Sequence, residues 1–134
     1  MRLKKTVMTT AVILGLIAGA ASAKTALRDV PEIDQPMFSV AMALEISDKC
    51  GSIKARTFKG LAFLNELRGK AKSMGYSDAE IKAYVRSDAE KARMRKIGGE
   101  YMRAKGLDPE VADDLCKLGQ MEMAQGTQIG SFLR

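Results

Sequence analysis

The residue types best suited to catalysis and metal binding are scarce in this sequence. It contains no histidine, the commonest general base and a frequent metal ligand, so Ser–His and Cys–His catalysis are excluded. Its two cysteines cannot form an ordinary structural zinc site without histidine partners. The acidic residues cluster where we expect helices to begin, and the helix dipole accounts for them there. We therefore expect no catalytic residue, no metal site and no cofactor.

Two methionines near the C-terminus have the soft ligand chemistry that binds Cu(I). Met121 and Met123 are two positions apart in an expected helix, so their side chains point to different faces. Methionine also fills irregular gaps in apolar cores, and aromatic residues make up only 5% of this chain. We interpret both methionines as core residues.

A basic run is the strongest candidate for a binding surface. The segment 91–96 contains Lys91, Arg93, Arg95 and Lys96, four basic residues in six positions. It could face an acidic partner or anionic lipid headgroups. The alternative is a solvated helix face whose charge is moderated by neighbouring glutamates. For an interfacial helix, bulky apolar residues would be expected opposite the charges, and this segment offers few.

The N-terminus has the three-part layout of a secretory signal peptide. A basic start with Arg2, Lys4 and Lys5 precedes an almost uncharged run at 7–19, and Ala21-Ser22-Ala23 follows. The pattern predicts a signal peptide at 1–23, cleavage between Ala23 and Lys24, and a periplasmic product. An uncleaved anchor is the alternative, but a membrane-spanning helix needs roughly 20 apolar residues. We expect no stable membrane anchor after cleavage.

Cleavage changes the charge balance of the chain. The formal net charge falls from +6 to about +3, with 19 basic and 16 acidic residues remaining beyond residue 23. This ordinary balance argues against nucleic-acid binding, which usually needs a concentrated basic face.

The rest of the chain has the pattern of an all-α protein. We expect an extended arm at 24–35 and a single helical domain at 36–134, a compact bundle of four to five short helices. The expected helices are 36–49, 53–74, 77–86, 87–105 and 108–125. Gly51 is expected to form a left-handed cap after the first helix, and Gly75, Gly106 and Gly126 to end later helices. Asp108-Pro109 is expected to begin the last main helix.

One tetrapeptide marks two of these helix starts. Ser77-Asp78-Ala79-Glu80 has the spacing of a capping box, and the same four residues recur at 87–90. The recurrence favours two helices, with one helix bent at Ser87 as the alternative.

The two cysteines are expected to form an intramolecular disulfide. An exported chain enters an oxidising compartment, and Cys50 and Cys116 are not arranged as a redox-active Cys-x-x-Cys pair. Cys116 lies on a stripe of mostly small residues with Ala112 and Gly119, where another helix can approach closely. The bond would tie the first and last main helices together. Two buried free thiols, or a bridge between two copies, are the alternatives.

Several segments resemble a known family. They are LRDVPEID at 27–34, GYSDAEIKAYV at 75–85, SDAEKARMR at 87–95 and the ending at 116–134. These motifs are similar to those of an uncharacterised family of small exported alphaproteobacterial proteins, classed as a domain of unknown function. The resemblance covers nearly all of the chain after the signal peptide. It implies export and a helical fold, and it implies no chemistry.

These features favour a non-enzymatic periplasmic accessory or interaction protein that contacts an envelope or membrane protein complex. A carrier of a small apolar ligand is one alternative, and an enzyme with an unrecognised carboxylate site is another. A carrier should contain an apolar cavity of about a few hundred Å³. An interaction protein should have an exposed patch, and an enzyme should have convergent carboxylates with shifted pKa values in a cleft.

Overall fold

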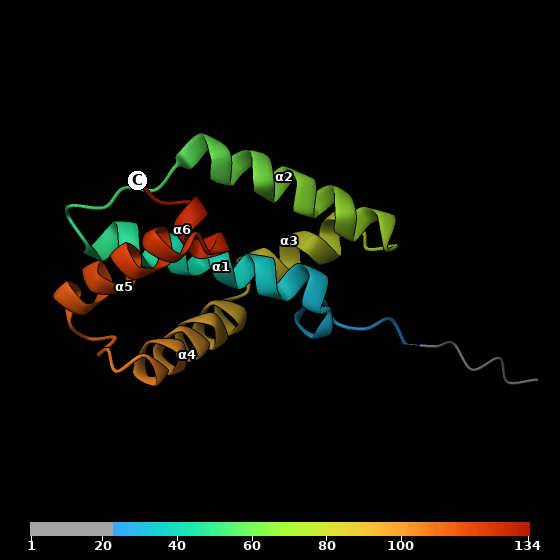
Figure 1. Ribbon diagram of the computed structural model, residues 1–134. Coiled ribbons are helices and arrows are strands. Elements are labelled where there is room, and N and C mark those ends of the chain that lie inside the picture. Colours follow the sequence, from blue (N-terminus) through green and yellow to red (C-terminus); the bar gives the residue numbers. More distant parts are fainter. Residues whose placement is uncertain (1–22) are drawn as a thin grey trace, which may run out of the picture.

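The computed structural model describes residues 23–134, and this part of the chain is all helical, as predicted (Figure 1). The elements in order are the 3₁₀ turn η1 (Leu27–Asp29) and the helices α1 (Pro31–Lys49), α2 (Thr57–Ser73), α3 (Asp78–Arg86), α4 (Asp88–Ala104), α5 (Ala112–Gln125) and α6 (Gln128–Ser131). Helix α1 runs through the middle, with α2 on one side and α4 on the other (Figure 1). The predicted signal peptide at 1–23 lies outside the described residues except for Ala23.

The first helix begins earlier than predicted. The segment we expected as an extended arm to residue 35 is extended only at its start, and α1 begins at Pro31 rather than Pro36. Pro31 occupies the first helical position, where its missing N–H costs nothing, and two acidic residues follow in the first turn. Pro36 is then carried inside the helix. The early start matters because it places Asp34 on α1, facing α4.

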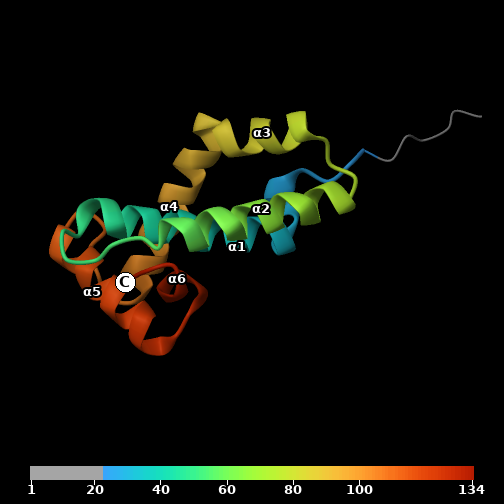
Figure 2. The same cartoon turned by 90° about the horizontal axis from the view of Figure 1, so that it is seen from above.

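The two Ser-Asp-Ala-Glu segments begin two separate helices, α3 and α4. The Ser77 hydroxyl accepts a hydrogen bond from the Glu80 N–H, and the Glu80 carboxylate accepts one from the Ser77 N–H, which completes the predicted capping box. The Ser87 hydroxyl likewise accepts from the Glu90 N–H at 3.2 Å. The result is an elbow between α3 and α4 (Figure 2), and Asp78 at the start of α3 pairs with Arg68 of α2 at 2.7 Å.

Two other helix boundaries were predicted wrongly. Helix α2 begins at Thr57, because Ile53 is a buried loop residue and Ala55 pairs with Leu133 in an isolated antiparallel bridge. Helix α5 begins at Ala112, because the Asp108 side chain caps a turn by accepting from the Glu110 N–H.

The predicted glycine caps were only partly correct. Gly51 does not adopt a left-handed conformation, whereas Gly75, Gly106 and Gly126 all have positive φ, at the ends of α2, α4 and α5.

The main core joins α1, α5 and α6 to the bridge between them. Ile46, Leu115 and Leu118 are completely or almost completely buried. Gly119 permits the close approach, since a Cβ at this position would lie 2.6 Å from the Ile53 side chain and 2.8 Å from that of Ile46. The C-terminal tail packs against this core, with its apolar residues Ile129, Phe132 and Leu133 buried.

The predicted disulfide between Cys50 and Cys116 is present. Its Cα atoms are 5.2 Å apart, and the bond links the residue that follows α1 to the middle of α5. Cys50 is fully buried beside the core formed by α1 and α5.

The apolar residues of α2 are divided between the core and the surface. Leu67 and Ala71 are buried in a second, smaller cluster with Leu27, Ile33 and Tyr76. Phe58 and Leu61, at the start of the helix, are 89% and 59% exposed.

Among the described residues, no helix is both long and apolar enough to cross a membrane.

Candidate functional site

An apolar groove of about 660 Å³ lies between α1 and α4. Its apolar lining includes Met37, Val40, Ala41 and Leu44 from α1, Val85 from α3, and Met94 and Met102 from α4. The groove is open to solvent, since Leu44 is 57% exposed and Val85 is 46% exposed. An open apolar depression of this size can receive a ligand without rearrangement of the backbone.

Two adjacent glycines shape the α4 side of the groove. Gly98 and Gly99 are both buried in the middle of α4 and line the groove. A Cβ at Gly98 would lie 2.6 Å from the sulfur of Met42 on α1. Glycine destabilises a helix interior by about 1 kcal/mol relative to alanine. At Gly98 this loss accompanies close packing of α4 on α1.

Charged side chains edge the groove. Lys91 and Arg95, one turn apart on α4, are both exposed and both line it. Glu45, Asp48 and Lys49 line it from α1, where the Lys49 ammonium pairs with the Glu45 carboxylate at 2.7 Å. Hydrogen bonding to Glu45 raises the pKa of Lys49, so Lys49 stays charged beside its partner.

The structure divides the four basic residues predicted as a partner surface. Lys91, Arg95 and Lys96 are exposed, but Arg93 points toward α1 and its side chain is only 24% exposed. Lys91 and Arg95 belong to the groove, and Lys96 does not line it. Arg93 is therefore a residue of the interior network described next.

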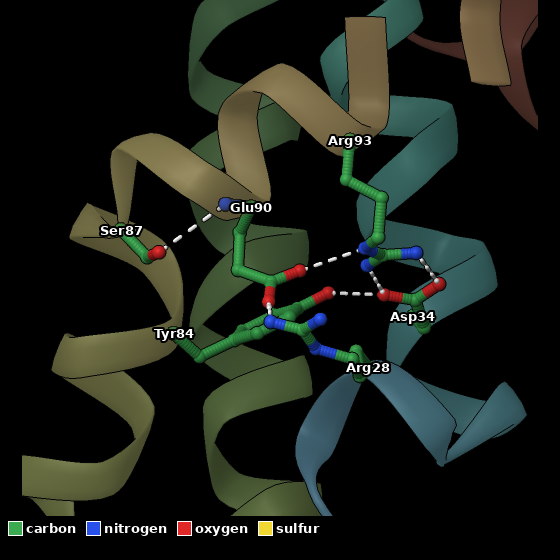
Figure 3. A network of polar contacts seen from close by, with 6 residues as sticks. All are labelled: Arg28, Asp34, Tyr84, Ser87, Glu90 and Arg93. Atoms are coloured by element: carbon green, nitrogen blue, oxygen red, sulfur yellow. Dashed lines mark hydrogen bonds and ion pairs between the residues drawn. The ribbon is translucent and has the colours of Figure 1, made fainter. Parts of the chain in front are cut away.

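A network of charged side chains lies beside the groove (Figure 3), and two of its members, Tyr84 and Glu90, also line the groove. The Arg93 guanidinium donates to the Asp34 carboxylate through two nitrogens, one of them at 3.1 Å, and its Nε donates to Glu90 at 2.7 Å. Arg28, from η1, forms an ion pair with the other oxygen of Glu90. The Tyr84 hydroxyl donates to Asp34 at 2.6 Å. The network thus joins η1, α1, α3 and α4.

Burial and pairing fix the charge states of Arg93 and Tyr84 in this network. Hydrogen bonds to Asp34 raise the pKa of Arg93, so the guanidinium remains charged. Burial, aided by the bond to Asp34, raises the pKa of the Tyr84 hydroxyl, so it remains a neutral donor. Glu90 is only 6% exposed. These groups neutralise one another, and such pairing suits a structural role better than proton transfer.

A second buried carboxylate joins α4 to the C-terminal helices. Glu122 is completely buried and accepts a hydrogen bond from the Tyr101 hydroxyl at 2.5 Å and another from the Thr127 hydroxyl. The Lys105 ammonium is 3.8 Å from the same carboxylate. Burial, followed by the bond to Glu122, raises the pKa of Tyr101. Glu122 does not line the groove, so the two buried carboxylates do not converge on one cleft.

The sequence did not reveal this network. In the sequence, Arg93 is one of four neighbouring basic residues, and Asp34 falls in the segment predicted as an extended arm. The sequence indicated only that Glu90 belongs to a helix start, because it occupies the position of a capping-box glutamate. In the structure its carboxylate pairs with two arginines instead. No pattern in the linear sequence indicates that Arg28 pairs with Glu90.

The remaining predicted residues lie apart from the groove. The Lys24 ammonium donates to the Gly75 carbonyl at 2.8 Å and pairs with the Glu80 carboxylate, so the start of the described chain is fastened to the α2–α3 turn. Met123 packs against the main core and Met121 is half-buried. Within residues 23–134, no three acidic or cysteine side chains gather as a metal site.

The fold and groove define a class: a small disulfide-bonded helical protein with an open apolar groove beside its central helix. Residues 25–134 match a protein family of unknown function, DUF5333, and the chain belongs to that family. No curated protein and no solved structure matches the chain.

Proposed function

We propose that this protein is a periplasmic accessory factor that binds an amphipathic helix of a partner protein in the groove between α1 and α4. The N-terminal pattern of a cleaved signal peptide supports export. The Cys50–Cys116 disulfide supports the same compartment, since such bonds persist where thiols are oxidised. The observation that carries the proposal is the open, apolar, charge-edged groove.

The dimensions of the groove suit a short helix. The α1 residues that line it extend from Met37 to Lys49, which corresponds to about 18 Å of helix at 1.5 Å per residue. That length accommodates roughly three turns of a partner helix, whose apolar residues at positions i, i+3 or i+4 and i+7 would occupy the groove.

The side chains that line the groove suit an adaptable contact. Met37 and Met94, which are both partly exposed, contribute flexible, polarisable thioethers, which repack readily around a partner side chain. Lys91 and Arg95 lie one helical turn apart at the rim, so they can pair with acidic residues flanking the partner's apolar face. The partner segment is therefore an amphipathic helix with acidic residues along one border.

A carrier of a small apolar ligand is the second candidate, because the groove volume lies within the range of about 300–1,000 Å³ of small-molecule sites. The open side favours a helix, since a carrier buries most of its ligand.

Photocrosslinking in cells separates the two candidates. A photoreactive amino acid replacing Leu44, in the groove, should give protein adducts, whereas the same replacement at Met74, which is exposed at the end of α2 and lies outside the groove, should not. The double change Lys91→Glu and Arg95→Glu should abolish the Leu44 adducts. The double change Lys82→Glu and Arg86→Glu, an exposed pair with the same spacing on α3, should leave them. Adducts of lipid mass alone would favour the carrier, and a lack of Leu44-specific adducts would refute both.

A further inference from the structure

A second exposed surface lies at the start of α2, on the opposite side of α1 from α4 (Figure 1). Phe58 is 89% exposed and Leu61, three residues later on the same helical face, is 59% exposed. The helix does not need Phe58 for its own packing, because Phe63 already packs against Phe132 with ring centroids 5.0 Å apart. A fully exposed phenylalanine beside an exposed leucine forms an apolar projection.

The projection is surrounded by positive charge. Lys54, Arg56 and Lys59 are exposed around it in sequence, and no acidic residue occurs between Asp48 and Glu66. Arg134 joins them in space, since its N–H and carbonyl pair with the backbone of Lys54 at 2.9 and 2.8 Å.

The backbone beneath this surface is well anchored. The Arg56 N–H donates to the Phe132 carbonyl at 2.7 Å, and the Ala55 N–H donates to the Ser47 hydroxyl at 2.9 Å. These bonds fix the basic residues relative to Phe58. The N-terminal turn of α2 adds the positive end of the helix dipole, and that turn contains no acidic residue.

We infer that this surface, formed by Lys54, Arg56, Phe58, Lys59, Leu61 and Arg134, docks reversibly on an anionic phospholipid bilayer. Basic side chains near such a surface are attracted by its negative potential, and an aromatic side chain inserts between headgroups. An apolar projection surrounded by basic residues is complementary to an anionic bilayer. It is not complementary to an apolar protein core. The inference is independent of the groove, which lies on another face and would remain free for a partner.

Vesicle sedimentation tests the inference with the protein from Lys24 onward, which contains every described helix and the disulfide. The protein should sediment with vesicles of phosphatidylcholine and phosphatidylglycerol, but not with phosphatidylcholine alone, and salt should release it. Phe58→Ser should weaken binding about tenfold, because the aromatic ring is no longer buried. Leu44→Ser, a change of another exposed apolar residue that lies in the groove, should have no effect.

The charge contribution has its own matched pair. Lys59→Gln should weaken binding about fivefold, whereas Lys70→Gln, an exposed lysine near the other end of α2, should change it less than about twofold. Circular dichroism should show that all variants remain folded. Failure of the unaltered protein to bind anionic vesicles, or equal binding by Phe58→Ser, would overturn the inference.

A spectroscopic readout distinguishes lipid from a second copy of the chain. The sequence has no tryptophan, so Phe58→Trp introduces a single reporter. Its emission should shift to the blue on addition of anionic vesicles and be quenched by brominated lipid. The matching change Val85→Trp, at the groove, should give no shift. A blue shift that depends on protein concentration without lipid would mean that this surface joins two copies, and would also overturn the inference.

Discussion

The two ends of α1 are held in place by different kinds of interaction. At its C-terminal end, α1 contributes Ile46 and Cys50 to a core of buried apolar residues, and a disulfide fixes it to α5. At its N-terminal end, Asp34 joins a network of charges that holds α4 and η1. The groove spans both ends, so one part of its lining belongs to a covalently fastened core and the other to an elbow held by polar contacts.

The difference assigns different roles to the two regions. Buried ion pairs contribute little net stability, because desolvation offsets most of their attraction, but removing one partner is costly. The network therefore sets the position of the elbow more than it stabilises the fold. We expect the α3–α4 elbow to open locally before the α1–α5–α6 core, and the width of the groove to depend on the network.

The largest effect is expected at the disulfide. Cys50 and Cys116 are separated by 66 residues, and the chain-entropy model gives about 4 kcal/mol of stabilisation for a loop of that length. The double change Cys50→Ala and Cys116→Ala should lower the free energy of unfolding by about that amount, measured by urea denaturation. Reduction of the unaltered protein should reproduce the loss, and an unchanged midpoint would show that the core alone holds this end.

The next largest effect is expected at Arg93. Arg93→Met leaves Asp34 and Glu90 without their shared cation, and the partial exposure of the site should limit the cost to about 2 kcal/mol. Arg95→Met, an exposed change two residues away, should cost less than about 0.5 kcal/mol. Hydrogen exchange should be faster in α3 and α4 of the Arg93 variant and unchanged in α5. Uniform acceleration would show that the two regions unfold as one.

The same contrast explains what the sequence could predict. The capping box at Ser77 and the glycine stops after α2, α4 and α5 depend on residue type and near neighbours, and these predictions were confirmed. The disulfide was also confirmed, because an exported chain with only two cysteines has one intramolecular pairing. The start of α1 was missed because Pro36 is as good a first residue as Pro31, and only the packing of Ile33 and Asp34 decides between them. The groove and its network depend on contacts between helices far apart in sequence, which a linear pattern does not contain.

A smaller effect is expected at the cap of α3. Ser77→Ala removes the hydroxyl that accepts from the Glu80 N–H and should lower stability by about 1 kcal/mol. Ser87→Ala removes the matching bond from the Glu90 N–H at the start of α4. The Glu90 carboxylate is held there by two arginines. We therefore expect the Ser87 variant to lose less than the Ser77 variant in urea denaturation. The reverse order would mean that the network depends on the α4 cap.

The smallest effect is expected from mild acid, and it too should separate the two ends of α1. A hydrogen bond from the Ser77 backbone, followed by one from Lys24, lowers the pKa of Glu80, and hydrogen bonds from Arg68 and Lys72 lower the pKa of Asp78. A carboxylate with a lowered pKa in the folded state contributes stability above its ordinary pKa and loses it as the pH falls through the folded value. For these two groups the loss begins near 4.5 and 3.8 and continues downward.

Near the C-terminal end of α1, helix α5 also contains a carboxylate with a lowered pKa, but this helix is held by the disulfide. Hydrogen bonds from Lys117 and the Asp108 backbone lower the pKa of Asp114, near the start of α5, so acid weakens this start as well. The disulfide nevertheless keeps α5 against α1 when the Asp114 bonds are lost. Hydrogen exchange measured as the pH is lowered below 4.5, after correction for the intrinsic rate, should therefore show protection lost in α3 before α5. Glu80→Gln should reduce the dependence on pH in α3 alone, and simultaneous loss in both helices would contradict the division.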